Sequence, residues 1–327
     1  MLATPSPHLV IPFARCSGDA WLQTMKNLPH GKQGSLKNLG KLLQGMKLIE
    51  TDAGEALSLS TPHERVLAKE KGLTDAEPTV DGLIPWAAWE AKANTGKAWA
   101  FITPCHWAMG REHATLTDPA ALELTETESK TLLAAMQPYF ETGGITLHYV
   151  QPSRWLAEGE VFRHLPTASL DRVLGRNVDA WLPASKPIKL LQNEMQMLLY
   201  THPLNDERGS RRLRSVNSFW VSGTGALPPT PPSPPTASSP AQHITVPRIL
   251  AQAAFTDDWT AYAQAWAALD ASDIAAHLAR QNSGETVRLT LCGESKAQTF
   301  ETAKPGFFTR ISSLLAPQPP LIILEQL

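Results

Sequence analysis

Residues 98–107 read AWAFITPCHW, and this stretch decides how the rest of the chain is interpreted. Its first six residues, Ala98–Thr103, are almost entirely apolar, which is typical of a buried strand. Further along, Thr125–Phe140 carries acidic residues in its first turn, as a helix favours, and Ile145–Gln151 is the next strand candidate. A strand, a helix and a strand in succession indicate an α/β architecture.

The same alternation extends outward in both directions, with further strands predicted at Leu9–Phe13, Ser215–Val221 and Thr286–Leu291. We therefore expect an α/β fold with a mostly parallel or mixed sheet flanked by helices. Ligands of such sheets lie beyond the carboxyl ends of the strands. The segments that follow predicted strands, and so are candidate ligand positions, are Pro104–Trp107, Ser222–Gly225 and Cys292–Glu294.

A proline-rich stretch divides the chain. Residues 226–241 (ALPPTPPSPPTASSPA) contain seven prolines, which is typical of a surface insertion or linker. The same composition also suits a motif recognised by a proline-binding domain. We expect residues 1–225 to form the main α/β region and residues 242–327 to complete the same fold, with a helix at Phe307–Leu315.

Composition excludes several classes of partner. The 327 residues include 29 basic and 31 acidic side chains, giving a net charge of −2, which provides no basic surface for nucleic acid. Three widely spaced cysteines fit a reducing compartment rather than a disulfide framework. The apolar runs are too short for a signal segment or a membrane span, so we expect a cytoplasmic protein without a membrane partner.

The densest polar segment is residues 191–220, which combine a helix, a loop and a strand. Amide side chains one helical turn apart can pair with each other or bind a ligand. The alternative interpretation is a helix terminus with ordinary capping and turn residues. If the segment is a binding site, we expect its pocket to be lined by Asn193, Gln196, His202, Asn205, Asp206, Arg208, Asn217 and Ser218.

The basic residues of this segment form a second candidate. Arg208, Arg211, Arg212 and Arg214 lie between the predicted helix and the predicted strand. Guanidinium groups bind phosphate or carboxylate in a bidentate manner, which suits an anion site. The alternative is a solvated basic loop.

Residues 104–118 offer nucleophile and metal chemistry. Cys105 is a possible nucleophile with His106 or His113 as its base, although a buried structural cysteine has the same sequence signature. His106, His113 and Asp118 are candidate metal ligands, but their spacing matches no compact ligand motif. The chain contains no HExxH, paired CxxC, Walker loop or G-x-S-x-G motif.

Several runs together resemble one protein family. ITPCHW, TASLDRVLGRNVDAWLP, LQNEMQMLLYTHPLND, VNSFWVSGTG, STPHERVLAKEKGL and VRLTLCGE are similar to the proteobacterial regulatory proteins of the RpfE type, which are often labelled cofactor-independent phosphoglycerate mutases. The resemblance spans nearly the whole chain apart from the proline-rich stretch. It implies a distant alkaline-phosphatase-like core, which in active members holds two divalent metals and a Ser or Thr nucleophile.

The chain departs from that family pattern at two predicted strand ends. The resemblance implies an aspartate after the first strand and a Gly-Asp-His motif after a late one. This chain has Ala14-Arg15-Cys16 and Cys292-Gly293-Glu294 at those places. The ligand set that the resemblance implies is therefore eroded, and the scaffold is retained as an expectation.

These observations leave three hypotheses. The first is a non-catalytic, regulatory relative that needs no cofactor and binds a small anionic or phosphorylated ligand or a protein partner. The second is a metal-dependent phosphoglycerate mutase or phosphoryl-transfer enzyme that uses Mn, Zn or Mg. Its rearranged ligands would be His106, His113, Asp118, Glu194, His202 and Asp206. The third is a cysteine-dependent enzyme built on Cys105.

Overall fold

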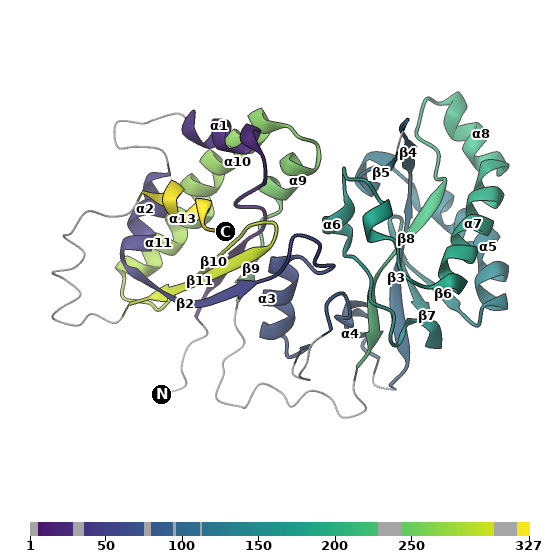
Figure 1. Cartoon of the computed structure of the whole chain (residues 1–327), viewed down its shortest axis with the longest axis horizontal. Coiled ribbons are helices and arrows are strands. Elements are labelled where there is room, and N and C mark those ends of the chain that lie inside the picture. The colour runs from purple at the N-terminus through teal and green to yellow at the C-terminus, as the bar shows by residue number, and fades with distance from the viewer. Residues whose placement is uncertain are drawn as a thin grey trace. The chain divides into compact units, whose positions relative to one another are not determined.

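The computed structural model describes residues 6–28, 36–74, 80–93, 96–111, 113–227, 243–303 and 319–327. Most of the proline-rich stretch and the predicted helix Phe307–Leu315 lie outside these residues. The chain divides into two units, each with its own sheet and core (Figure 1). One unit comprises Met1–Ala56, Pro62–Val66 and Pro235–Leu327, and the other comprises Leu57–Thr61 and Leu67–Pro234.

These units cut the chain differently from the predicted regions 1–225 and 242–327. The reason is strand pairing, because the first strand of the chain lies beside strands from its last third. In spatial order, the sheet of the first unit consists of β2 (Met46–Ala53), β11 (Lys296–Thr302), β10 (Arg288–Cys292), β1 (His8–Ile11) and β9 (Ile244–Thr245). The strand β1 is parallel to β10 and β9, while β11 is antiparallel to both of its neighbours, β10 and β2. The predicted mixed sheet is therefore confirmed.

Helices cover one face of this sheet (Figure 1). They are α1 (Asp19–Lys26), α2 (Lys37–Gln44), α9 (Ile249–Phe255), α10 (Trp259–Leu269), α11 (Ala275–Asn282) and α13 (Pro320–Glu325). Leu9 and Ile11 of β1 join Trp266 and Leu269 of α10 in one fully buried apolar core. The buried residues Tyr262, Trp266 and Leu269 recur at helical spacing along α10, so this face of the helix belongs to the core.

One helix of this unit is capped from a distance. The helix α2 has no side-chain cap of its own, because Leu36 precedes it in the left-handed conformation. The carboxylate of Asp270, in the π-helical turn Asp270–Ile274, accepts the backbone N–H groups of Asn38 at 3.1 Å and Leu39 at 2.8 Å. A carboxylate at a helix N-terminus is favoured by the helix dipole, so this contact fixes α2 against the segment after α10.

The second unit is built on a sheet that is antiparallel throughout. In spatial order its strands are β6 (Thr146–Gln151), β7 (Arg154–Glu158), β3 (Ala98–Cys105) and β8 (Ser218–Ala226), and a separate pair joins β4 (Trp107–Met109) to β5 (Ala114–Leu116). Its helices are α4 (Trp86–Glu90), α5 (Glu126–Thr142), α6 (Leu170–Val173), α7 (Lys186–Tyr200) and α8 (Pro203–Ser210), with 3-10 turns η1 (Pro119–Leu122), η2 (Glu160–Phe162) and η3 (Asp179–Trp181). The helix α3 (Pro62–Glu70) begins in the first unit and ends in the second. The expectation of parallel strands thus applies only to the first unit.

Two of the three predicted ligand segments lie inside strands instead of following them. Pro104 and Cys105 belong to β3, and residues 222–225 belong to β8. The register between these strands shifts where Gly223 sits with φ of +61°, and a Cβ added there would lie 2.7 Å from the ring of Phe101. The Ser-Gly-Thr-Gly stretch therefore forms a bulge against an aromatic ring, not a ligand loop.

The core of the second unit lies between its sheet and two helices. Trp155 of β7 and Phe219 of β8 pack with Phe140 of α5 and with Met195 and Leu199 of α7, all fully buried. Within the described residues, no helix combines the length and apolar character needed to cross a membrane.

Candidate functional site

The helix α7 carries the first members of the predicted binding site. It begins at a Ser185 cap, whose hydroxyl accepts the N–H of Ile188, and a proline occupies its first turn. Asn193 is exposed and Gln196 is half-buried, so both stay on the outer part of the helix. Gln192, one position before Asn193, is instead buried and donates to the backbone oxygen of Phe219 at 3.2 Å.

The next members form a second helix where the sequence predicted a loop. His202 caps α8, since its ring Nδ1 accepts the N–H of Leu204 at 3.2 Å. The Asn205 amide donates to the backbone oxygens of Leu199 and Val216 at 2.7 and 2.8 Å, and its oxygen accepts the N–H of Val216 at 2.9 Å. Asn205 therefore ties the end of α7 to the start of β8, while Asp206 faces solvent.

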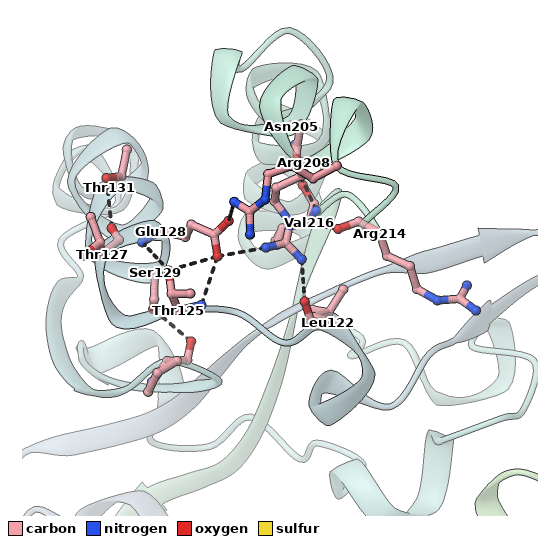
Figure 2. A network of polar contacts seen from close by, with 12 residues as sticks. Leu122, Thr125, Thr127, Glu128, Ser129, Thr131, Asn205, Arg208, Arg214 and Val216 are labelled. Atoms are coloured by element: carbon pink, nitrogen blue, oxygen red, sulfur yellow. Dashed lines mark hydrogen bonds and ion pairs between the residues drawn. The ribbon is translucent and has the colours of Figure 1, made fainter.

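Arg208 is the most deeply buried charge of the segment, with none of its side chain exposed. Figure 2 shows its guanidinium between Glu128 and two backbone oxygens. Nη1 lies 2.9 Å from Oε2 of Glu128, Nε donates to the oxygen of Arg214 at 2.8 Å, and Nη2 donates to the oxygen of Leu122. Because every one of these partners belongs to the protein, Arg208 holds the fold together instead of facing a ligand.

Glu128 is the partner that the sequence analysis did not connect with Arg208. It belongs to a capping box in which Thr125 and Glu128 bond each other's backbone N–H groups at the start of α5. Burial opposes ionisation of this carboxyl, but the bonds from Thr125 and the charge of Arg208 outweigh it, so the pKa of Glu128 lies below its usual value. The Thr-x-x-Glu pattern was a visible signal for the cap, but not for the arginine that joins it.

The remaining predicted residues lie at the end of β3 and the start of β8. Asn217 holds Trp107 through two bonds, accepting its N–H at 2.7 Å and donating to its oxygen at 3.0 Å. Ser218 is fully buried opposite Cys105 in the strand register, and its hydroxyl has no hydrogen-bond partner among the described residues. Burial raises the pKa of the Cys105 thiol far above its ordinary value, which leaves it protonated and unreactive at neutral pH.

The eight predicted residues differ in what they contact, and a pocket lined by all of them stays a prediction. Asn205, Arg208 and Asn217 satisfy the chain's own backbone, and His202 caps a helix. The alternative interpretation of the segment, capping and turn chemistry, describes these four contacts. Asn193 and Asp206 face solvent on two different helices.

The three candidate metal ligands also have separate surroundings. The His106 ring Nδ1 lies 2.9 Å from the backbone oxygen of Ser215, His113 is exposed, and Asp118 caps η1 by accepting the N–H of Ala120. In the described part of the chain, no three His, Cys, Asp or Glu side chains are grouped so that they could hold a metal ion. Glu194 is exposed on α7, in a different element from these three.

The carboxyl ends of β1 and β10, in the first unit, are where a ligand site of a parallel sheet would lie. There the Tyr262 hydroxyl donates to the backbone oxygen of Phe13 at 2.7 Å and accepts the Trp21 ring N–H at 3.1 Å. Burial raises the pKa of Tyr262 well above its ordinary value, so it stays a neutral donor. The backbone also closes this edge of the sheet, because the N–H of Ala14 donates to the backbone oxygen of Cys292 at 2.7 Å.

Two charged side chains at this edge are also engaged by the chain itself. Arg15 donates to the backbone oxygen of Leu327 at 3.1 Å, and Glu294 accepts the N–H of Ser17 at 3.1 Å. Leu327 is buried and lies so close to Gly293 that an added Cβ would approach it to 3.0 Å. An arginine, two buried thiols and one engaged carboxylate do not fit a two-metal centre, which requires several carboxylate and imidazole ligands.

The sequence did not predict a row of buried, hydrogen-bonded side chains that begins on β1. The His8 ring Nε2 lies 2.7 Å from the hydroxyl of Thr290, which lies 2.8 Å from the hydroxyl of Thr299. Burial, together with the nearby Arg288 and His277, lowers the pKa of His8 to about 4. The only signal in the sequence was a histidine at the start of an apolar strand, which does not name partners 282 positions away.

Comparisons with known proteins add little to this picture. No protein-family model matches the chain, and no curated protein matches it either. Two solved structures are similar at 12% identity. The cofactor-independent phosphoglycerate mutase from Thermoplasma acidophilum DSM 1728 has a TM-score of 0.33 over 90% of this chain and 89% of that one. The PH0037 protein from Pyrococcus horikoshii has a TM-score of 0.41 over 92% of this chain and 88% of that one.

The fold and the contacts define a mixed α/β protein made of two units. At such low identities and TM-scores, the two likenesses leave its function to be argued from this chain's own residues. The RpfE-type family and the alkaline-phosphatase-like core remain predictions from the sequence.

Proposed function

We propose that this protein is a non-catalytic, regulatory binding protein that recognises a small anionic or phosphorylated ligand. The observation that carries the proposal is the closed carboxyl edge of β1 and β10. There Arg15, Glu294 and Tyr262 contact the chain's own backbone. These side chains are engaged in hydrogen bonds within the chain, whereas a metal-dependent phosphoryl transfer would need several carboxylate and imidazole ligands at this edge.

The raised pKa of Cys105 also favours binding over catalysis. A catalytic cysteine needs a lowered pKa and access to its substrate. The Cys105 thiol is fully buried, and its pKa is displaced in the opposite direction. The same is true of Cys292, where burial and the charge of Asp52 raise the pKa.

The anionic character of the ligand is supported by the loop after α8. Arg211, Arg212 and Arg214 are exposed there, and the buried Arg208 anchors the loop through the oxygen of Arg214. Figure 2 shows the Arg214 side chain extending away from the Arg208–Glu128 network. Arg211 is bound loosely, with its Nη1 3.3 Å from Glu128 and more than half of its side chain exposed. Guanidinium groups on an anchored loop are suited to bidentate contacts with phosphate or carboxylate.

The first test separates binding from metal-dependent catalysis. The untagged full chain, purified without chelators and incubated with Mn²⁺, Zn²⁺ or Mg²⁺, is analysed by plasma mass spectrometry and assayed for phosphoglycerate interconversion. We expect well under one equivalent of retained metal and no turnover. About two retained equivalents together with mutase activity would replace the proposal with the phosphoryl-transfer hypothesis.

The second test addresses the anion. Inorganic phosphate and 3-phosphoglycerate are titrated against the full chain by calorimetry at low salt, and the double variant Arg212→Ala/Arg214→Ala is expected to bind at least about tenfold more weakly. The matched control removes two exposed cations from α7, Lys186→Ala/Lys189→Ala, and is expected to leave the affinity unchanged. Equal losses in both double variants would mean that only net charge matters, and the arginine loop would then not be the site.

A further inference from the structure

The outward face of α7 carries an apolar stripe that lies outside the core of its unit. Leu190 is 58% exposed, Met197 is 73% exposed and Tyr200 is 84% exposed. The opposite side of the same helix, with Met195 and Leu199, packs beside α5 into the core of the second unit (Figure 1). Large apolar side chains gathered on one exposed face mark an interaction surface, whereas singly exposed ones need no explanation.

The spacing of this stripe is that of a seam between paired helices. Its members Leu190, Asn193, Met197 and Tyr200 follow one another at intervals of three, four and three residues, and all four are exposed. This alternation is the a and d pattern of a coiled coil, in which the seam of one helix packs against the seam of another. The stripe is therefore suited to a second helix as its partner.

Opposite charges flank the seam. Lys189 precedes Leu190 on one side of it, and Glu194 follows Asn193 on the other side. Both side chains are exposed, and neither has a hydrogen bond or an ion pair within the part of the chain that the structure describes. Five residues separate them, which places them about 140° apart around the helix, so they cannot pair with each other inside one copy.

The two flanks select both the partner and its direction. When two copies of α7 lie parallel about a two-fold axis, the Lys189 flank of each copy faces the Glu194 flank of the other. We propose that α7 pairs in this parallel arrangement with α7 of a second copy of this chain. The offset of five residues is about 7.5 Å along the axis, which two long side chains span. The two-fold axis makes the contact occur twice.

An antiparallel pair of the same helices would not use these charges. Reversing one helix brings each flank against the same flank of the other copy, so Lys189 no longer faces Glu194. The parallel arrangement also places each seam residue beside its own copy across the axis. The two Asn193 amides then meet, and each supplies both donors and an acceptor to the other. A polar pair of this kind within an apolar seam specifies register at a cost in stability.

Two features limit the strength of this dimer. Lys186 continues the seam toward the start of the helix, so its ammonium lies near that of the second copy, although its long stem can carry the charge out to water. A seam of four residues also buries less than the roughly 1,600 Å² of a standard stable interface. We therefore expect a dissociation constant on the order of 10 to 100 µM. The proposal does not depend on which ligand the second unit binds.

Neutralising the two lysines separates this arrangement from a general effect of charge. Sedimentation velocity of the full chain over roughly 1 to 500 µM measures the dissociation constant. Lys189→Gln loses the attraction to Glu194 and is expected to weaken self-association by about threefold. Lys186→Gln removes a like-charged contact and is expected to strengthen it by about threefold. The two variants have the same net charge, so a change in the same direction would overturn the proposal.

Charge exchange tests which flanks meet. Lys189→Glu and Glu194→Lys each place two like-charged pairs across the axis and are each expected to weaken association by about tenfold. An equimolar mixture of the two variants restores opposite charges at both contacts and is expected to dimerise as the wild type does. The double variant Lys189→Glu/Glu194→Lys is expected to do the same. A mixture that associates no better than either variant alone would contradict the parallel pairing.

Crosslinking tests the direction of the helices. The native cysteines are buried, so Asn193→Cys introduces an accessible thiol at the axis, and mild oxidation is expected to join two copies through it. The matched control Gln252→Cys, exposed on α9, is expected to crosslink at least about tenfold more slowly. Equal rates would overturn the proposal, as would a wild-type chain that stays monomeric over the whole concentration range. Circular dichroism establishes that these exposed substitutions leave the fold intact.

Discussion

Each unit of the molecule buries a network of polar side chains that joins distant parts of the chain, but the two networks differ in charge. In the first unit the network is neutral, running from His8 through Thr290 to Thr299 between three strands. In the second it is an ion pair, Arg208 with Glu128, between two helices. The neutral chain is vulnerable to a proton, whereas the ion pair is vulnerable to the loss of either partner, because the other is then left charged and buried. The same structural role therefore gives the two units different weaknesses.

The largest effect is expected from breaking the ion pair. Arg208→Leu leaves the Glu128 carboxylate buried without its cation and removes the donors to Leu122 and Arg214, so we expect the free energy of unfolding to fall by about 3–5 kcal/mol. Urea unfolding followed by tryptophan fluorescence measures it.

The double variant Arg208→Leu/Glu128→Leu sharpens this result. It removes both charges, and we expect it to recover part of the loss, since an apolar pair can replace a buried ion pair. As a control, Lys130→Ala breaks the exposed pair with Glu126 and should have no measurable effect on unfolding. A loss from Arg208→Leu no larger than that of the control would show that the buried pair is dispensable.

The neutral chain of the first unit predicts a dependence on pH. The pKa of His8 is lowered to about 4 in the folded state, so its stabilising contribution is complete above the ordinary histidine value of 6.5 and is lost as the pH falls toward 4. The loss amounts to at most about 3 kcal/mol across this window. His277, whose pKa burial also lowers, acts in the same direction.

Urea midpoints at a series of pH values between 7 and 4 check this prediction. His8→Gln keeps a donor toward Thr290 but does not titrate, so its midpoint is expected to change less over the window than that of the wild type. Arg208→Leu provides a contrast, because protonation of the Glu128 carboxyl at the acid end of the range removes the uncompensated charge, so its destabilisation relative to the wild type is expected to shrink as the pH falls. Identical slopes for His8→Gln and the wild type would assign the pH dependence to other groups.

The smallest effect concerns how one helix of each unit ends. In the first unit α11 ends on Gly284, with φ of +90°, and in the second α8 ends on Arg212, with φ of +59°. Both ends close the same bond pattern, from Glu285 to the oxygen of Arg280 and from Leu213 to the oxygen of Arg208. A side chain in this conformation is strained and glycine is not, so Arg212→Gly is expected to stabilise the protein by up to about 1 kcal/mol.

The reciprocal substitution tests the same argument in the other unit. Gly284→Ala has open space around its added methyl group, so any loss comes from the backbone alone, and we expect about 1 kcal/mol. Thermal melts of both variants against the wild type are sufficient. Destabilisation by Arg212→Gly would mean that the Arg212 side chain makes a contact worth more than the strain it causes.

The sequence by itself determined the elements whose signals lie within a few residues. Acidic residues in the first turn predicted a helix from Thr125, and α5 begins there with Thr125 as its cap. In α10 the buried residues Tyr262, Trp266 and Leu269 recur at helical spacing, a pattern that is contained in the local sequence. These features depend on neighbours one turn apart, so a local reading of the chain is sufficient.

The tertiary structure alone decided direction, partners and the fate of the polar side chains. Whether β8 lies parallel or antiparallel to β3, and whether Gly223 is a bulge or a loop, depends on strands more than 100 residues apart. Likewise Arg208 became a buried structural charge because Glu128 and the oxygen of Leu122 meet it from another part of the chain. A donor or acceptor in a sequence does not name its partner, since the partner is determined when the whole core packs and leaving a buried polar group unpaired costs free energy.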